Sequence, residues 1–424
     1  MRRHRRSGRI GRYRLAAAGV LVSLLPATAG DFHASGDGSG TNNPDLINGG
    51  GCENCTYAVP PQEPAAPFFE ADWSLSLRGA YVIDDDGAHF EALAVPRVTL
   101  RHDTMRGGYS LEAEAELVKS SLEEHRLSAL RLRLEGEHAL DAVTGLSGEL
   151  ELELTQESAG TPGGTAAEPV VMSGTAGVAA ERRFGRFAVG VRGAAGRTVY
   201  GPTRLSDGSE EDNSAQNNWT VEGGLRLGYE VTPLLTAFID GSVGYQRYDE
   251  PSPTYMVTLD AADYELRAGL AANWHEILEA EASVGVGLRR FAEPALGEVT
   301  TTLYDASLTY RPDETVTLTA ALSTNVGAPA PESGGTARVE YEATGSASYQ
   351  VNPWLRLRAS AGWEHAQLVG IAGSESGYSL GSGLDYQLNE HTLLTADYDF
   401  SHEQTDTTEG EDEHRVTLGV TLSR

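Results

Sequence analysis

The sequence predicts an all-β fold: a closed antiparallel transmembrane β-barrel of about 18 strands (16–20) behind a disordered N-terminal tail. Three observations predict it. From residue 73 onward, apolar and polar residues alternate with a period of two over segments of about ten to fourteen residues. Short and long connections alternate along the C-terminal half of the chain. An aromatic residue also ends the strand before each short connection in this half.

The composition excludes several other classes of protein. The 424 residues include 61 acidic and 32 basic side chains, and 40% of them are hydrophobic. No segment after the N-terminus approaches the roughly 20 apolar residues of a membrane-spanning helix. The apolar fraction is too high for a disordered acidic chain. The net charge of −29 argues against a nucleic acid partner, because phosphates require a basic surface.

Residues 1–29 have the pattern of a bacterial-type secretory signal peptide. Seven arginines form a basic segment, an apolar run extends from Leu15 to Leu25, and Ala27 to Ala29 match the A-x-A cleavage pattern. Eleven apolar residues are too few to span a bilayer as an anchor helix. Cleavage near Ala29 makes the exported chain more acidic, because it removes seven arginines and no acidic residue.

Residues 30–70 are rich in Gly, Ser, Asn and Pro, a composition that predicts a disordered periplasmic tail. The tail contains the only two cysteines, Cys52 and Cys55. In an oxidising periplasm we expect a local disulfide between them. Metal binding is the alternative, but it needs two further ligands and none is evident nearby. A lipoprotein cysteine would follow the apolar run directly, and Cys52 lies more than 20 residues beyond it.

Residues 71–424 are predicted to form the barrel. In the segment VTLTAALST, for example, Val316, Leu318 and Leu322 fall on one face of a strand and Thr317 and Thr319 on the other. The predicted strands are 73–83, 91–101, 109–118, 126–136, 145–155, 170–182, 185–198, 218–230, 233–247, 259–274, 277–290, 300–311, 315–325, 337–350, 354–365, 376–388, 391–402 and 413–423.

The connections indicate which kind of β-protein this is. Five aromatic residues precede short links: Tyr229, Trp274, Tyr310, Tyr349 and Tyr386. The intervening connections are longer and polar: 200–218, 247–255, 325–336, 365–377 and 401–413. A soluble β-sandwich has no reason to sort its loops by length, whereas outer-membrane barrels have short periplasmic turns and longer extracellular loops.

Aromatic girdles at both membrane interfaces are typical of such barrels. The five aromatics before short turns would form the periplasmic girdle. A second set precedes the longer loops and would form the outer girdle: Tyr81, Tyr245, Tyr248, Trp363 and Phe400. We therefore predict a bacterial outer-membrane location. The alternative is a large soluble β-protein such as a solenoid.

Charged residues accumulate on the face that the register assigns to the interior. The predicted lumen-lining residues are Glu112, Glu114, Glu116, Arg131, Arg133, Glu149, Glu151, Glu153, Glu222, Arg226, Glu265, Arg267, Glu279, Glu281, Arg356 and Arg358. Arginine facing lipid near the midplane would cost about 2–4 kcal/mol, so these residues indicate a polar interior. Two interpretations stay open: a water-filled, cation-favouring channel, or a charge network that only braces the wall.

The region from about Trp219 to Arg424 resembles the "Putative beta-barrel porin 2" family of Gram-negative outer-membrane proteins. The resemblance is carried by the segments YQVNPWLRLRASAGWEH and YQLNEHTLLTADYDFSH and by the final strand HRVTLGVTLSR. It implies an outer-membrane barrel, associated in some members with polysaccharide export, and it supplies no catalytic residues. One departure is Arg424, which stands where such barrels usually end on an aromatic residue.

No enzymatic motif is convincing. The segment His275-Glu276-Ile277-Leu278-Glu279 begins like a zinc-binding H-E-x-x-H motif but lacks the second histidine, so a turn is the better interpretation. The acidic segments 84–86, 207–212 and 409–413 have no ligand spacing of a known cation site and are interpreted as solvated loop tips. We expect no catalytic residue, no cofactor and no bound metal.

The polar interior favours a porin-like channel for passive diffusion of small hydrophilic solutes, with a slight cation bias. The alternative is a structural or exopolysaccharide export-associated barrel without an open pore. The expected partners are outer-membrane lipid, lipopolysaccharide and the barrel-assembly machinery. A periplasmic protein bound through the N-terminal tail is a further expected partner.

Overall fold

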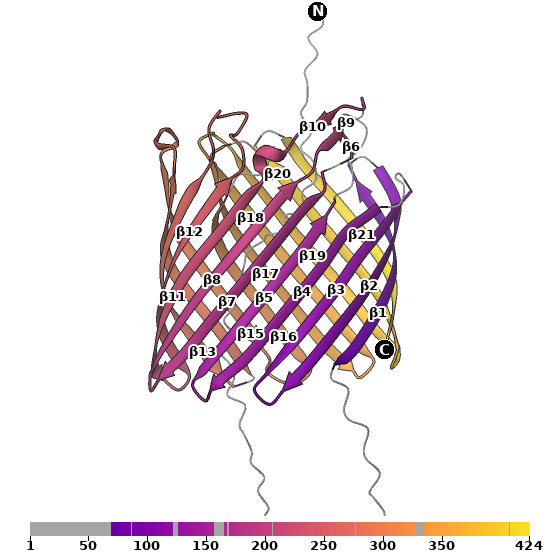
Figure 1. Cartoon of the computed structure of the whole chain (residues 1–424). Coiled ribbons are helices and arrows are strands. Elements are labelled where there is room, and N and C mark those ends of the chain that lie inside the picture. The colour runs from indigo at the N-terminus through magenta and orange to yellow at the C-terminus, as the bar shows by residue number, and fades with distance from the viewer. Residues whose placement is uncertain are drawn as a thin grey trace, which may run out of the picture.

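The computed structural model describes residues 69–424 except 86, 122–125, 157–164, 168, 206, 276, 328–334 and 407. Eighteen antiparallel strands form one sheet that closes on itself, which confirms the predicted fold class and strand number (Figure 1). The predicted signal peptide, the tail and the Cys52–Cys55 pair lie outside the described residues.

The barrel strands follow each other around the ring in chain order, because each pairs with its neighbours in sequence and the last pairs with the first. They are β1 (Glu70–Asp84), β2 (Gly87–Thr104), β3 (Gly107–Ser120), β4 (Arg126–Asp141), β5 (Thr144–Thr155), β7 (Val171–Phe184), β8 (Phe187–Tyr200), β11 (Asn218–Thr232), β12 (Leu235–Tyr248), β13 (Ala261–Trp274), β14 (Leu278–Phe291), β15 (Glu298–Tyr310), β16 (Val316–Gly327), β17 (Ala337–Asn352), β18 (Leu355–Val369), β19 (Ser374–Asn389), β20 (Thr392–Thr405) and β21 (Thr408–Ser423). Among the described residues, no helix is long and apolar enough to cross a bilayer.

The two ends of the barrel differ in their connections. At the turn end, where the C-terminus lies, every connection has two to five residues (Figure 1). At the loop end, connections reach 15 residues over 156–170 and 17 residues over 201–217. A small sheet of β6 (Thr165–Ala167), β9 (Thr203–Leu205) and β10 (Glu210–Glu211) also lies at the loop end (Figure 1). The ends therefore match the periplasmic and extracellular ends of an outer-membrane barrel.

Side-chain hydrogen bonds close the tight turns at the turn end. The Asn352 carboxamide oxygen accepts hydrogen bonds from the backbone N–H groups of Trp354 (3.1 Å) and Leu355 (2.9 Å). Asp313 likewise accepts from the Thr315 backbone N–H at 2.8 Å. Asn and Asp favour turns because their short side chains bond to the backbone two residues on. These bonds explain the recurring Asn or Asp in the short links.

Large apolar side chains on the outward face are exposed at every second position, as a lipid-facing wall requires. The five aromatics of the predicted periplasmic girdle are all exposed near the turn end. Tyr81, Tyr245 and Trp363 of the predicted outer girdle are exposed as well.

The assignment of Tyr248 to the outer girdle was wrong. Even-numbered residues of β12, such as Asp240, face inward, and Tyr248 is one of them. Only 7% of Tyr248 is exposed. The preceding residues alternate so that Tyr245 faces outward, and Tyr248 lies three positions further along, which puts it on the opposite face.

Two predicted loops were also wrong, because residues 365–377 and 401–413 lie mostly within strands. β18 continues to Val369 and β19 begins at Ser374, while β20 continues to Thr405 and β21 begins at Thr408. Apart from Ala366, Leu368 and Val369 in β18, the residues of these strand tips are polar or glycine on both faces, so the alternation that marks a half-buried strand is weak in them.

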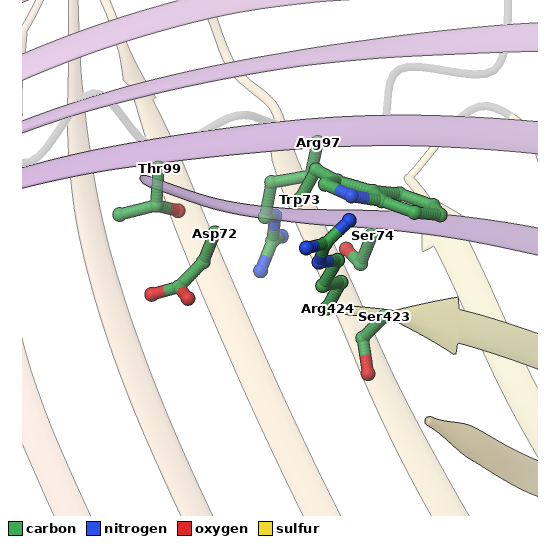
Figure 2. Close-up of a pocket in the computed structure, with 7 residues that line it drawn as sticks. All are labelled: Asp72, Trp73, Ser74, Arg97, Thr99, Ser423 and Arg424. Carbon is green, nitrogen blue, oxygen red and sulfur yellow. The ribbon is translucent and has the colours of Figure 1, made fainter. Parts of the chain in front are cut away.

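The ring closes between β1 and β21, where the chain ends. The backbones of Trp73 and Arg424 exchange two hydrogen bonds of 3.1 and 3.0 Å. Figure 2 shows both side chains beside a shallow depression, together with Ser74, Ser423 and Arg97. At this corner of the wall the aromatic ring belongs to the first strand, opposite the arginine that occupies the terminal position.

The outward face provides a direct test of the fold. Leu266 lies near the middle of β13 and is 61% exposed. We expect Leu266→Arg to lower the free energy of unfolding by about 2–4 kcal/mol, because it places a charge in hydrocarbon. The matched control is Ser307→Arg, on the inward face of β15. Denaturant unfolding in lipid vesicles measures both, and an equal loss in the two variants would contradict the assignment of faces.

Candidate functional site

The structure places all sixteen predicted lumen-lining residues on one face of the wall, opposite the exposed apolar side chains. We call this the inner face. Several of its ion pairs join strands that are not neighbours, such as Arg192 on β8 with Asp240 on β12 at 2.7 Å. Side chains reach over an intervening strand most easily on the concave side of a curved sheet. The inner face therefore carries its charged residues as a network of ion-paired groups.

Seven inner-face arginines each lie within 4.0 Å of two carboxylates. They are Arg97, Arg131, Arg192, Arg267, Arg338, Arg358 and Arg415. Arg131, for example, lies 3.3 Å from Glu114 and 2.7 Å from Glu153 on the two adjacent strands. Since Glu114 is shared with Arg97, the seven arginines face thirteen different carboxylates.

Glycine on the intervening strand allows an arginine to cross it. Arg192 makes a bidentate pair with Asp240, with N–O distances of 2.7 and 2.8 Å, and crosses β11 at Gly224. A Cβ atom on Gly224 would lie 2.6 Å from the Arg192 guanidinium carbon, closer than real Cβ contacts. Asp240 is only 7% exposed, so its charge depends on this pair. Losing one partner of a buried pair costs about 3–5 kcal/mol.

The same arrangement recurs twice on the inner face. Arg267 crosses β14 at Gly285 and reaches Asp305 on β15 at 2.8 Å. Arg358 crosses β19 at Gly383 and reaches Asp397 on β20 at 2.6 Å. In both cases a Cβ on the glycine would collide with the crossing pair, at 2.6 Å from Arg267 Cγ and 2.2 Å from Asp397 Oδ1. Glycine weakens a strand, and here the loss is offset by ion pairing across it.

Arg226 spans the widest gap. Its guanidinium lies 3.7 Å from the ring centroid of Phe238 on β12 and makes a bidentate pair with Glu281 on β14, at 2.9 and 2.7 Å. The Phe238 ring occupies space that Gly269 leaves open on β13, because a Cβ there would lie 2.5 Å from the ring. Cation–π contact and the ion pair together hold this arginine against the wall.

The remaining predicted residues share the inner face but are held locally or have no described bond. Glu116 accepts a hydrogen bond from Ser128 Oγ at 2.7 Å, Arg133 pairs with Glu135 at 2.8 Å, and Arg356 donates to Gln350 at 3.0 Å. Glu149, Glu151 and Glu279 lie on this face without an ion pair among the described contacts.

Sequence reasoning missed several members of the network: Glu91, Arg97, Arg192, Phe238, Asp305, Asp385 and Arg415. The period-two alternation of their own strands would have assigned each of them to the inner face.

At the loop end, the network gives way to rim contacts. Arg197 Nη1 donates to Asp249 Oδ1 at 2.9 Å, and its guanidinium lies 5.1 Å from the Trp219 ring centroid. The hydrogen bond from Arg197 lowers the pKa of the Asp249 carboxyl below its ordinary value. This carboxylate therefore stays charged in mildly acidic medium.

The described residues bring no three His, Cys, Asp or Glu side chains together in an arrangement that could hold a metal ion. His275, which begins the segment that resembles a zinc motif, lies in the turn between β13 and β14 with a left-handed backbone φ of 51°. Chemically, the inner face is a polar surface of ion-paired arginines with additional carboxylates.

The crossing glycines can be tested with adjacent residues. We expect Gly224→Ala to lower the free energy of unfolding by about 1–3 kcal/mol, because the added methyl displaces Arg192 from Asp240. Gly223→Ala is the matched control, since its Cβ would meet nothing within 4 Å. Chemical unfolding in lipid vesicles measures the difference. Equal stability of the two variants would show that Arg192 does not depend on the open space at Gly224.

Comparison with protein families gives a match over most of the chain. A family model described as "Putative beta-barrel porin 2" matches residues 86–424. The outer membrane protein OpdK of Pseudomonas aeruginosa is 12% identical, with a TM-score of 0.43, over 84% of this chain and 99% of its own. OccK3 (OpdO) of the same organism is 13% identical, with a TM-score of 0.41, over 84% of this chain and 96% of its own. No curated protein matches the sequence. The chain belongs to the "Putative beta-barrel porin 2" family and is a porin-like barrel of the bacterial outer membrane.

Proposed function

We propose that the barrel is a channel for passive diffusion of small hydrophilic solutes, with a slight preference for cations. The observation that carries this proposal is the excess of carboxylates on the inner face. Seven arginines there face thirteen carboxylates, and Glu149, Glu151 and Glu279 lie on the same face without an ion pair among the described contacts. A wall with this composition attracts cations and repels anions at short range. Selectivity rings of Asp and Glu act in the same way in cation channels.

The charge excess also favours a wet interior. A carboxylate without its own cation is stable in the ionised form only where water solvates it, because burial of an unpaired charge costs several kcal/mol or more. Half-exposed pairs such as Arg133 and Glu135, at 52% and 49%, agree with solvent on this face. A dry, tightly braced wall would instead match each carboxylate with one cation.

The family assignment and the barrel favour a channel over an enzyme. The competing proposal is a structural or exopolysaccharide export-associated barrel without an open pore, which would recruit a periplasmic partner through the tail. Lipid and lipopolysaccharide around the exposed apolar face, and the assembly machinery that inserts the chain, are proposed for either function.

Conductance of the purified protein in planar bilayers separates the two functions. The channel proposal expects stable stepwise conductance and a reversal potential in a KCl gradient that indicates K⁺ preference. A silent bilayer from protein with intact heat-modifiable β-structure would exclude the open pore.

The cation preference should depend on the surplus carboxylates. We expect the double variant Glu114→Gln, Glu153→Gln to move the reversal potential toward zero, because Arg131 then lacks both its carboxylate partners. Glu298→Gln is the control, since this residue is exposed on the opposite face of β15. A reversal potential that is equal in both variants would show that the inner face does not set the selectivity.

A further inference from the structure

One of the eighteen seams of the barrel is incomplete. The register between β15 and β16 covers only five residue pairs, from Ala306 opposite Leu322 to Tyr310 opposite Leu318. Every other seam has at least ten. Both strands continue toward the loop end, β15 to Glu298 and β16 to Gly327. The ladder therefore stops although strand remains on both sides.

A side chain replaces the backbone partner where the ladder stops. The Tyr304 backbone N–H donates to Thr324 Oγ1 at 3.0 Å, and the same hydroxyl donates to the Tyr304 carbonyl at 3.0 Å. Thr324 is only 3% exposed. A hydroxyl that bonds to both backbone groups of one residue stands where the opposite backbone would stand in an intact ladder. We call this pair of bonds the threonine clip.

Beyond the threonine clip, the wall overlaps itself. Ala261, Phe291, Val299, Ala337 and Val339 form one buried apolar cluster, with Val326 packed against it. Ala261, Phe291 and Val299 occupy inward positions on β13, β14 and β15. Val326, Ala337 and Val339 instead occupy positions in register with the outward side chains of β16 and β17. These two sets can pack together only if the loop-end parts of β16 and β17 lie inside β13–β15. Leu303, an inward residue of β15 with 0% exposure, agrees with this cover.

The overlap lies within the membrane. Tyr310 marks the turn-end girdle, and Tyr304 lies six residues nearer the loop end of β15. At about 3.3 Å per residue and a strand tilt of 35–45°, this is about 15 Å into the bilayer. The unpaired stretch thus lies in the leaflet next to the loop end, the outer leaflet. Open sheet edges facing lipid are not stable in hydrocarbon, so an incomplete seam at this depth calls for an explanation.

We propose that the β15–β16 seam is a lateral opening that admits the hydrocarbon chain of an amphipathic lipid from the outer leaflet. On the outside, the exposed side chains of Tyr304, Leu318 and Leu322 flank the seam. Between the two overlapping layers lies the apolar cluster. On the inward face of β15, one residue from Tyr304, lies Asp305, which pairs with Arg267 at 2.8 Å. This sequence of surfaces, apolar and then charged, fits a molecule with an apolar chain and a polar head.

Opening this seam disrupts less structure than opening any other. It breaks the two hydrogen bonds of the threonine clip and the bond from the Thr324 backbone N–H to the Asp305 carboxylate, and it separates apolar side chains, whose contacts an entering acyl chain replaces with similar ones. At every other seam, a backbone ladder of at least ten residue pairs would have to break in hydrocarbon. The proposal goes beyond diffusion of hydrophilic solutes and does not depend on whether the lumen conducts ions.

Quenching by lipid identifies the occupant. A bimane label is placed on Thr301→Cys, an inward position beside the apolar cluster, in the full chain with Cys52→Ser and Cys55→Ser. The protein is reconstituted in vesicles of phosphatidylcholine with brominated acyl chains. Controls are Thr302→Cys, an outward neighbour, and Ser307→Cys, an inward residue in the paired half of β15. We expect quenching at 301 close to that at 302 and little at 307. Quenching at 301 as low as at 307 would overturn the proposal.

The threonine clip provides the second test. Thr324→Val removes both hydrogen bonds at nearly constant shape, while Thr324→Ser retains the hydroxyl. We expect Thr324→Val to increase quenching of the label at 301 at least twofold, and Thr324→Ser to leave it unchanged. Heat-modifiable migration on gels verifies that each variant is a folded barrel. Equal quenching in the two folded variants would contradict a gating role for the clip. Lipid quenching without channel conductance would support the opening while the proposed pore fails.

Discussion

The backbone of a barrel in hydrocarbon has to pair around a closed ring, and this requirement determines the other features of the wall. Hydrocarbon offers no hydrogen-bond partner, so each strand must pair on both sides and the last strand must meet the first. The chain satisfies this with hairpins in sequence order and with a final seam from Ser74 opposite Ser423 to Ile83 opposite His414. The exception is the loop-end half of the β15–β16 seam, where the threonine clip and the overlap of the wall replace the ladder. Once the ring is closed, alternation assigns one face to lipid and the other to the interior. A negative mean hydropathy of −0.31 is compatible with this, because only every second residue has to be apolar.

The charges on the inner face are stabilised by ion pairing. Arginines on the inner face need carboxylate partners, and some of these partners lie on the adjacent strand. In three pairs the arginine instead crosses the adjacent strand at a glycine, Gly224, Gly285 or Gly383, and reaches a carboxylate on the strand after it. Each of these three crossing ion pairs connects two strands over the strand between them, on the inner face. The carboxylates outnumber the arginines that they surround. The same residues therefore both connect the strands and give the interior a net negative charge. The two interpretations that the sequence left open, a charge network and a polar channel, are thus compatible with one another.

The general fold could be predicted from the sequence, because periodicity and turn chemistry are local signals. The alternation around Val316 and Leu322 and the Asn of the turn at Asn352 each depend on a few adjacent residues. Tyr248 and the polar strand tips at 365–377 escaped prediction, because neither shows a lipid-facing alternation. The Arg192–Asp240 pair could not be predicted for a different reason. Its two residues lie on strands that are not neighbours, and the pair depends on the space that Gly224 leaves open on the strand between them. The β15–β16 seam leaves no local trace at all, since alternation runs through Tyr304 unbroken and the overlap depends on packing between Val299 and Val339.

One face of each strand meets lipid and the other meets a polar interior. Substituted-cysteine labelling along β13 (Ala261–Trp274), in vesicles and in the Cys52→Ser, Cys55→Ser background, tests it most directly. We expect odd positions such as 265, 267 and 271 to react with a charged, water-soluble thiosulfonate, while even positions such as 264, 266 and 268 are shielded from it and quenched by brominated lipid. Reactivity without a period of two, or the reverse assignment of the faces, would contradict it.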